Sequence, residues 1–105
     1  MSGKRRGLTL DDLRARREDI RRIAAAYGAF NIRVFGSVAR GEADAESDVD
    51  LLVDIVADAQ GFAYFGLIED LRLALVEALG SNVDIVDSAG LRRMRERVLR
   101  EAVPL

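Results

Sequence analysis

Residues 35–53 read FGSVARGEADAESDVDLLV, and this stretch decides how the rest of the chain is interpreted. A short apolar run ends in the turn Gly36-Ser37, ten residues follow, and the acidic pattern Asp48-Val49-Asp50 then opens an aliphatic segment. Apolar helical patterns lie on both sides, and a similar aliphatic run, VDIVD, places a third acid at Asp84. The stretch therefore predicts a functional site where a small-residue turn meets an acid-bearing strand.

The segment Asp48–Ile55 is the clearest strand of the sequence. Because strand side chains alternate with a period of two, Val49 and every second residue after it share one face, which we expect to pack on a core. Asp48 and Asp50 fall on the other face. Aspartate is depleted in strands, so this pair indicates either a bound ligand or two solvated acids on an exposed edge strand.

The position of Asp84 favours a bound ligand over two solvated acids. It lies between Val83 and Ile85 in a segment, Asn82–Val86, that also reads as a strand. If the two strands are neighbours, three carboxylates can converge, and a bound dication would relieve their repulsion. A third carboxylate can also take a proton from an incoming hydroxyl. Considered alone, Asp84 reads more simply as a surface acid.

Gly36-Ser37 is a candidate phosphate site. A glycine at a strand end lets the backbone approach a ligand closely, and Ser37 would open a short helical turn whose N–H groups and hydroxyl can bind phosphate oxygens. Arg40 can neutralise a triphosphate. Taken singly, these features also fit an ordinary turn and a solvated arginine. The Walker A pattern is absent, because Glu42 and Ala43 stand where lysine and serine or threonine belong.

The composition of the 105-residue chain fits one small domain with its own core, since half of the residues are apolar. The sequence contains no cysteine and no histidine. This excludes a disulfide framework, a thiol nucleophile, a serine–histidine–aspartate triad and the usual zinc sites. Any metal must be held by oxygen, which favours Mg²⁺ or Mn²⁺. No signal peptide or membrane span is visible, so we expect a cytoplasmic protein.

The net charge of −2 hides a strong asymmetry. Residues 1–40 carry ten Lys/Arg and four Asp/Glu, residues 41–90 carry one Arg and twelve Asp/Glu, and residues 91–105 carry five Arg and two Glu. The acidic surplus surrounds the Asp48–Asp50 region, where bound cations would relieve it. The basic ends fit an acidic partner, a phosphate backbone or simply solvated helix faces.

The fold class expected is α/β (α+β), with a small three-stranded mixed sheet and helices on one side. We expect residues 1–105 to form a single domain, with residues 1–8 as a flexible N-terminus. Thr9 and Asp12 predict a capping box, and Gly28 suits a left-handed helix end. The elements expected are a helix over Thr9–Tyr27, a strand over Asn31–Phe35, a helical turn over Ser37–Arg40, a loop over Glu42–Ser47, the strand Asp48–Ile55, a loop over Ala57–Gly61, a helix over Phe62–Leu79, a strand over Asn82–Val86 and a helix over Ala89–Ala102.

Together, Gly-Ser, a ten-residue spacing, Asp-x-Asp and a third aspartate in a later aliphatic strand resemble the signature of the DNA polymerase β-like nucleotidyltransferase superfamily. The small size and the text GSVARGEADAESDVDLLV over residues 36–53 are similar to the minimal nucleotidyltransferase (MNT) group. The resemblance covers about residues 9–103. Its spacing from Gly-Ser to Asp-x-Asp is specific, whereas Asp84 is assigned more loosely. Members of this group are commonly antitoxins paired with a helical HEPN-domain toxin that is a ribonuclease.

The resemblance implies a role for each motif residue. Gly36 and Ser37, with Arg40 beside them, would hold the phosphates of ATP. Asp48 and Asp50 would bind two Mg²⁺ ions, and Asp84 would complete the metal site and activate the acceptor hydroxyl. The reaction implied is transfer of AMP to a tyrosine of the toxin. The chain lacks the extra helical domain that larger relatives use for a small substrate, which fits an acceptor supplied by a partner protein.

Three interpretations stay open on the sequence alone. The first is a protein adenylyltransferase antitoxin, the second is a non-catalytic module that neutralises a toxin by contact, and the third is a nucleotidyltransferase acting on a small molecule or on RNA. We expect no membrane partner and no direct nucleic-acid binding. The apolar helix stripes leave room for a homo-oligomer or a toxin interface. No residue that reads the nucleobase is identifiable from the sequence.

Overall fold

A mixed sheet of four strands organises the protein. The computed structural model describes residues 7–56, 62–91 and 95–105. The strands are β1 (Ala29–Phe35), β2 (Val49–Ile55), β3 (Val83–Asp87) and β4 (Val103–Pro104), in the spatial order β3-β2-β1-β4. β1 runs antiparallel to β2 and β4, whereas β2 and β3 are parallel. The predicted α+β class with a mixed sheet is therefore confirmed.

The predicted number of three strands is wrong by one, because β4 adds an edge to β1. Val103 pairs with Val34, and Pro104 pairs with Arg33. The amide of Leu105 then donates to the carbonyl of Ile32 at 3.0 Å. A proline is tolerated here because an edge strand does not need every ladder donor. A two-residue strand is too short to leave an alternating pattern in the sequence.

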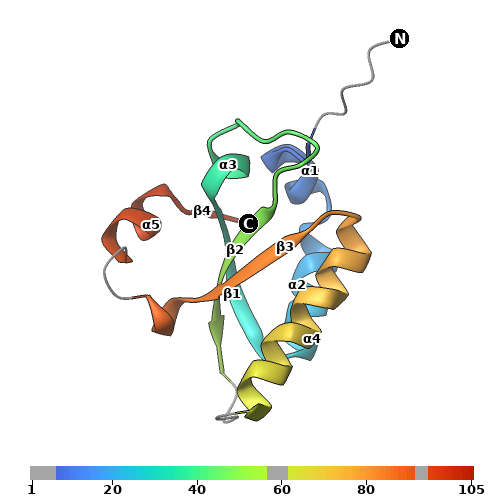
Figure 1. The fold of residues 1–105 in the computed structure, drawn as a ribbon, viewed down its shortest axis with the longest axis vertical. Helices are drawn as coiled ribbons and strands as arrows, with labels where there is room; N and C mark the ends of the chain where they lie inside the picture. The colour runs from blue at the N-terminus through green and yellow to red at the C-terminus, as the bar shows by residue number, and fades with distance from the viewer. Residues whose placement is uncertain (1–6, 57–61, 92–94) are drawn as a thin grey trace.

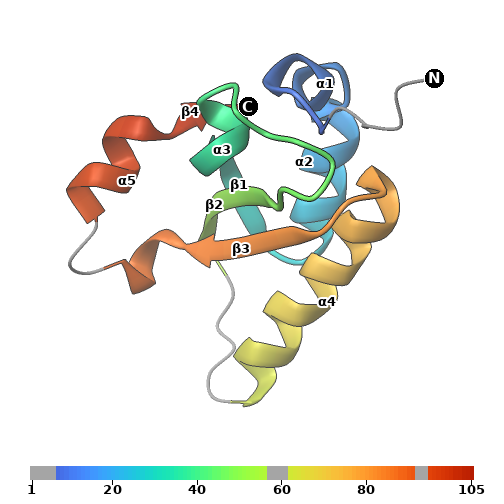
Figure 2. The ribbon, with the colours of Figure 1, turned by 45° about the horizontal axis from the view of Figure 1, so that its top comes forward.

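Helices cover both sides of the sheet. The structure has helices α1 (Leu10–Ala15), α2 (Arg17–Ala26), α3 (Gly36–Ala39), α4 (Phe62–Leu79) and α5 (Arg95–Glu101), with a 3₁₀ turn η1 (Ser88–Gly90). α2 and α4 lie side by side on one side, and α5 lies on the other (Figures 1 and 2). The expectation of helices on one side only is wrong for α5.

The first predicted helix is divided in two. The capping box of α1 is confirmed, since the amide of Asp12 donates to Thr9 Oγ1 at 3.0 Å and the amide of Thr9 donates to Asp12 Oδ2 at 2.9 Å. The helix then breaks at Arg16, whose guanidinium donates to the carbonyl of Ala78 in α4 at 3.1 Å. Neither glycine nor proline marks this break. Gly28 takes the predicted left-handed conformation, with φ of 76°.

The core lies between the sheet and the pair α2 and α4. The inward residues predicted for β2 are fully buried at Val49, Leu51 and Val53. α4 has the predicted bounds, although Ala78, expected on its inward stripe, is exposed. The side chains that make up this core include Leu13, Ile20, Ala24, Ile32, Val34, Val38, Val49, Leu51, Val53, Leu71, Leu75, Leu79 and Val83. The core thereby fixes the relative positions of β1, β2 and β3.

The last predicted helix is shorter than expected, and two predicted segments cannot be compared with the structure in full. Instead of one helix over Ala89–Ala102, the described residues form η1 and α5, and Asp87 caps η1 by accepting from the amide of Ala89. The predicted loop Ala57–Gly61, and residues 1–6 of the predicted flexible N-terminus, lie outside the described residues. Leu8 already packs against the core.

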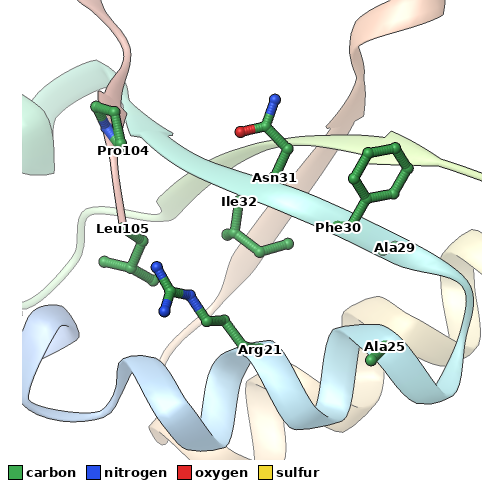
Figure 3. Close-up of a pocket in the computed structure, with 8 residues that line it drawn as sticks. All are labelled: Arg21, Ala25, Ala29, Phe30, Asn31, Ile32, Pro104 and Leu105. Carbon is green, nitrogen blue, oxygen red and sulfur yellow. The ribbon is translucent and has the colours of Figure 1, made fainter.

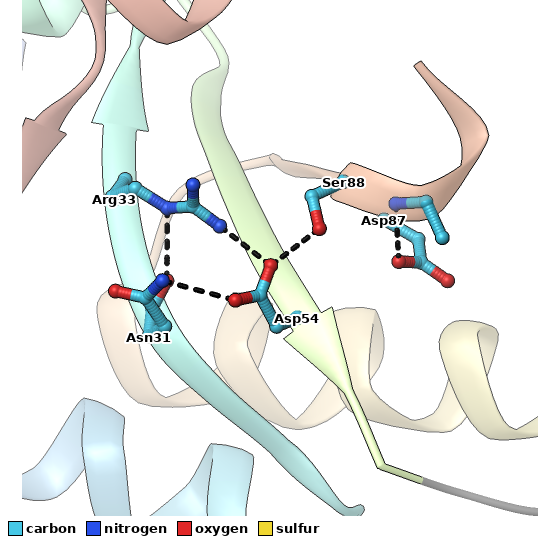
Figure 4. Close-up of polar contacts among 6 residues, drawn as sticks. Asn31, Arg33, Asp54, Asp87 and Ser88 are labelled. Atoms are coloured by element: carbon cyan, nitrogen blue, oxygen red, sulfur yellow. Dashed lines mark hydrogen bonds and ion pairs between the residues drawn. The ribbon is translucent and has the colours of Figure 1, made fainter.

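A polar cluster ties η1 to strands β1 and β2 (Figure 4). Asp54 of β2 accepts from Arg33 Nη2 at 2.7 Å and from Asn31 Nδ2 at 2.9 Å, and it also accepts from the hydroxyl of Ser88. The hydrogen bond from Ser88, then that from Asn31, and the charge of Arg33 lower the pKa of Asp54. The cluster therefore links β1, β2 and the start of the segment that leads to α5.

Asp54→Asn is expected to destabilise the protein by about 2 kcal/mol at neutral pH, because hydrogen bonds to a charged group are lost. Since folding lowers the pKa of Asp54, its stabilisation is present above the ordinary value of 3.8 and is lost as pH falls through the lower folded value. Urea unfolding of both proteins from pH 7 to pH 3 should show the difference shrinking in acid. The exposed Asp70→Asn is the control, and a pH-independent difference would contradict this explanation.

A hollow of about 350 Å³ lies at the β4 edge, away from the predicted site. Ile32 and Leu105 point into the space between β1 and α2, and Phe30 lies on the other side of β1 (Figure 3). None of the predicted site residues lines this hollow. In the described part of the chain, no helix has the length and hydropathy that a bilayer crossing requires.

Candidate active site

Strand pairing brings two of the predicted acids side by side. In the parallel pair of β2 and β3, Asp50 is aligned with Asp84, and in the antiparallel pair of β1 and β2, Phe35 is aligned with Asp50. Aligned residues of neighbouring strands are about 5 Å apart and share a face. Asp48 directly precedes β2 and is exposed, as is Asp84, whereas Asp50 is half-buried. Asp48, Asp50 and Asp84 are called the acidic cluster below.

Asp48 and Asp84 both act electrostatically on Asp50. Burial raises the pKa of Asp50, and the charges of Asp84 and Asp48 raise it further, whereas the nearby charge of Arg40 lowers it. Two like charges therefore lie close enough to disfavour ionisation of Asp50. In a folded protein this cost persists at neutral pH unless a cation offsets it.

The donor set of the acidic cluster fits a hard divalent cation. All of its ligand atoms are carboxylate oxygens, which Mg²⁺ prefers, and their repulsion favours a bound positive charge. Within the described ranges, no group of three or more acidic side chains is arranged so that it could hold one metal ion. Mg²⁺ does not need such a group, because it usually takes one or two carboxylates and completes its coordination with phosphates and water.

Gly36 lies directly against Asp50. It ends β1 and opens α3 with φ of +73°, a conformation that favours glycine. A Cβ atom built on it would lie 2.2 Å from Oδ2 and 3.1 Å from Cγ of Asp50. The missing side chain thus leaves the space that the Asp50 carboxylate occupies. The turn and the acid, which the sequence places fourteen positions apart, form one site.

Ser37 and Arg40 lie on α3 and at its C-terminal end, beside Gly36. Ser37 is half-buried, and none of the described residues hydrogen-bonds with its hydroxyl. Arg40 is half-exposed; its Nε donates to Glu42 Oε2 at 3.0 Å, and its Nη1 lies 3.9 Å from Glu101 Oε2. Arg40 is therefore shared between two carboxylates while remaining near Asp50.

Sequence reasoning missed the contribution of α5. A hollow of about 210 Å³ between α3 and α5 is lined by Phe35, Gly36, Arg40, Arg97, Val98 and Glu101. Phe35 adjoins the motif and aligns with Asp50, but an aromatic residue before the turn gives no signal of its own. The α5 residues reach the site only because β4 returns the chain to β1. That pairing could not be read from the sequence.

A mixed sheet with aligned aspartates on parallel strands, and a glycine next to one of them, is the arrangement that the nucleotidyltransferase motif led us to expect. The chain belongs to the nucleotidyltransferase domain family, whose model matches residues 16–104. The resemblance deduced from the motif is thereby confirmed, and the protein is a nucleotidyltransferase.

The similarity to known proteins extends over nearly the whole chain. The protein is 38% identical over 101 residues to the protein adenylyltransferase MntA of Thermococcus cleftensis, covering 91% of this chain and 95% of that one. A solved structure of a candidate minimal nucleotidyltransferase is 49% identical, with a TM-score of 0.78, and covers 93% of this chain and 97% of the other. A solved toxin–antitoxin with AMP-PNP is similar in fold, at 23% identity and a TM-score of 0.66, over 83% and 69% of the two chains.

Proposed function

We propose that this protein is an antitoxin that transfers AMP from ATP to a tyrosine hydroxyl of a cognate HEPN-domain ribonuclease toxin. The observation that carries the proposal is the alignment of Asp50 with Asp84, with Gly36 against the Asp50 carboxylate. The relative named protein adenylyltransferase MntA supports the choice of reaction. The solved toxin–antitoxin with AMP-PNP, which shares the fold, supports the choice of partner and nucleotide.

Each residue of the site has its own role in the reaction. Gly36, Ser37 and Arg40 bind and orient the β- and γ-phosphates. The tyrosine oxygen attacks the α-phosphorus in line, a new O–P bond forms, the bond to the β-phosphate oxygen breaks, and pyrophosphate leaves. Asp84 accepts the proton of the attacking hydroxyl. Its place at the edge of the acidic cluster, on an exposed strand position, leaves room for an acceptor from outside.

Asp48 and Asp50, with Asp84, are the residues that would hold two Mg²⁺ ions. When bound there, the ions would supply polarisation of the α-phosphate and stabilisation of the charge on the leaving pyrophosphate. Burial and the charges of Asp84 and Asp48 raise the pKa of Asp50, and a bound cation would favour its ionised form.

An acceptor on a partner protein fits the apolar side chains that this protein exposes. The described residues form a single sheet with its helices, and large apolar side chains remain exposed at Phe65, Leu73 and Phe30. Such side chains are candidates for a protein contact. The toxin would then supply both the contact surface and the tyrosine.

Label transfer tests the proposal. The protein is mixed with Mg²⁺, ATP and the product of the neighbouring gene as candidate toxin. Label from the α-phosphate should appear on a tyrosine of the partner, and label from the γ-phosphate should not. Asp84→Asn should remove the transfer. Label in RNA or in a small molecule would favour a different acceptor, and neutralisation without label would favour a non-catalytic antitoxin.

A further inference from the structure

The hollow between α3 and α5 is continuous with the predicted phosphate site. Gly36 and Arg40 belong to both, while Phe35 forms a wall from β1 and Arg97, Val98 and Glu101 form the wall from α5. A ligand whose phosphates lie at Gly36 therefore has this hollow next to it.

The size and the lining of the hollow fit one flat ring system. At about 210 Å³ it is smaller than pockets that enclose whole drug-sized ligands, which hold roughly 300–1,000 Å³. Phe35 and Val98 provide apolar walls, and Val98 is itself buried. Nucleobases stack on aromatic side chains regardless of sequence, because every base has a π-face.

The polar rim of the hollow carries hydrogen-bond donors and an acceptor. Arg97 Nε lies 3.5 Å from Glu101 Oε1, so donors and an acceptor stand side by side on α5. Adenine presents an amino donor next to a ring-nitrogen acceptor, whereas guanine presents two neighbouring acceptors on the same edge. The carboxylate of Glu101 would accept from the adenine amino group and repel the guanine oxygen.

We propose that this hollow holds the adenine base of the donor nucleotide, with Phe35 and Val98 against its faces and with Glu101 and Arg97 reading its edge. This inference rests on the proposed use of ATP. It assigns nucleotide selection to α5, outside the acidic cluster and the glycine-serine turn.

Two ligands separate base binding from phosphate binding. Calorimetry measures the affinity of the full chain with Mg²⁺ for ATP and for inorganic triphosphate. Phe35→Ala should weaken ATP binding roughly 5- to 150-fold, which corresponds to the loss of a stacked base, and should leave inorganic triphosphate binding within about twofold. Equal losses for both ligands would assign the hollow to phosphates and overturn the inference. Unchanged ATP binding would also overturn it.

Substitutions on the surface of α5 test the same inference with less risk of unfolding the protein. Glu101→Gln should reduce the preference for ATP over GTP roughly tenfold, because its amide can donate to the guanine oxygen. Arg97→Gln should weaken ATP binding, whereas Arg100→Gln, outside the hollow on the same helix, should not. An unchanged preference in Glu101→Gln would contradict the base-reading role. If the wild-type protein bound inorganic triphosphate but no nucleotide, the proposed function itself would fail.

Discussion

Asp50→Asn is expected to lower AMP transfer by on the order of a thousandfold while making the metal-free protein more stable. The loss follows because metal-assisted charge stabilisation contributes several kcal/mol, and each 1.36 kcal/mol changes a rate tenfold. The gain follows from the raised pKa of Asp50, since burial disfavours its charged form and Asp84 and Asp48 repel it. Transfer is measured with labelled ATP, and stability by urea unfolding in EDTA.

The pH dependence of the stability gain has a definite sign. A raised folded pKa gives stability that is present below the ordinary value of 3.8 and is lost as pH rises through the folded value. The advantage of Asp50→Asn should therefore be full at pH 7 and vanish near pH 3. Asp54→Asn, on the same face of the same strand, is the control and should retain transfer within a few-fold when folded. An inactive Asp50→Asn that was also less stable would point to a structural role.

Gly36→Ala is expected to lower AMP transfer about a hundredfold with little additional loss of stability. The new Cβ would lie 2.2 Å from Asp50 Oδ2, so the carboxylate must move. The atom that the new Cβ meets is at the end of a side chain that can rotate. The displacement should therefore change the position of the carboxylate more than it lowers the free energy of unfolding. A shift of about 1 Å in a reacting group can cost a hundredfold in rate. Single-turnover kinetics at saturating ATP would measure the loss.

Gly41→Ala is the matched control for this substitution. Gly41 has φ of +75°, nearly that of Gly36, but a Cβ at this position would meet nothing within 4 Å. The free energy of unfolding should fall by about 1 kcal/mol in both variants, because alanine is strained in the left-handed backbone conformation. Only Gly36→Ala should lose transfer. Similar activity losses in both variants would show that backbone strain, and not the position of the Asp50 carboxylate, is responsible.

The strong periodic signals of the sequence predicted the main elements of the fold. The alternation in Asp48–Ile55, the apolar stripe of α4 and the capping box at Thr9 each depend on local residue order, which the sequence displays. The features that were missed depend on tertiary contacts. The break at Arg16 coincides with a hydrogen bond to α4, and β4 exists only because Val103 and Pro104 reach β1.

In the candidate site, too, the residues of the motif could be predicted and those that depend on tertiary contacts could not. The motif predicted that Gly36, Asp50 and Asp84 belong together, and the parallel pairing of β2 with β3 gives a physical reason why Asp84 lies beside Asp50. Their catalytic roles stay predictions. The α5 wall of the hollow carries no motif, because Arg97 and Glu101 read as ordinary residues of a charged helix until β4 places them next to Gly36.

The stoichiometry of neutralisation tests the central claim, namely that this protein silences its partner by catalysis. The ribonuclease activity of the toxin is measured after incubation with increasing amounts of the protein, with Mg²⁺ and with or without ATP. The account predicts that, with ATP, one molecule of the protein silences a many-fold molar excess of toxin, and that Asp50→Asn does not. Silencing that needs one molecule per toxin and is the same without ATP would contradict it.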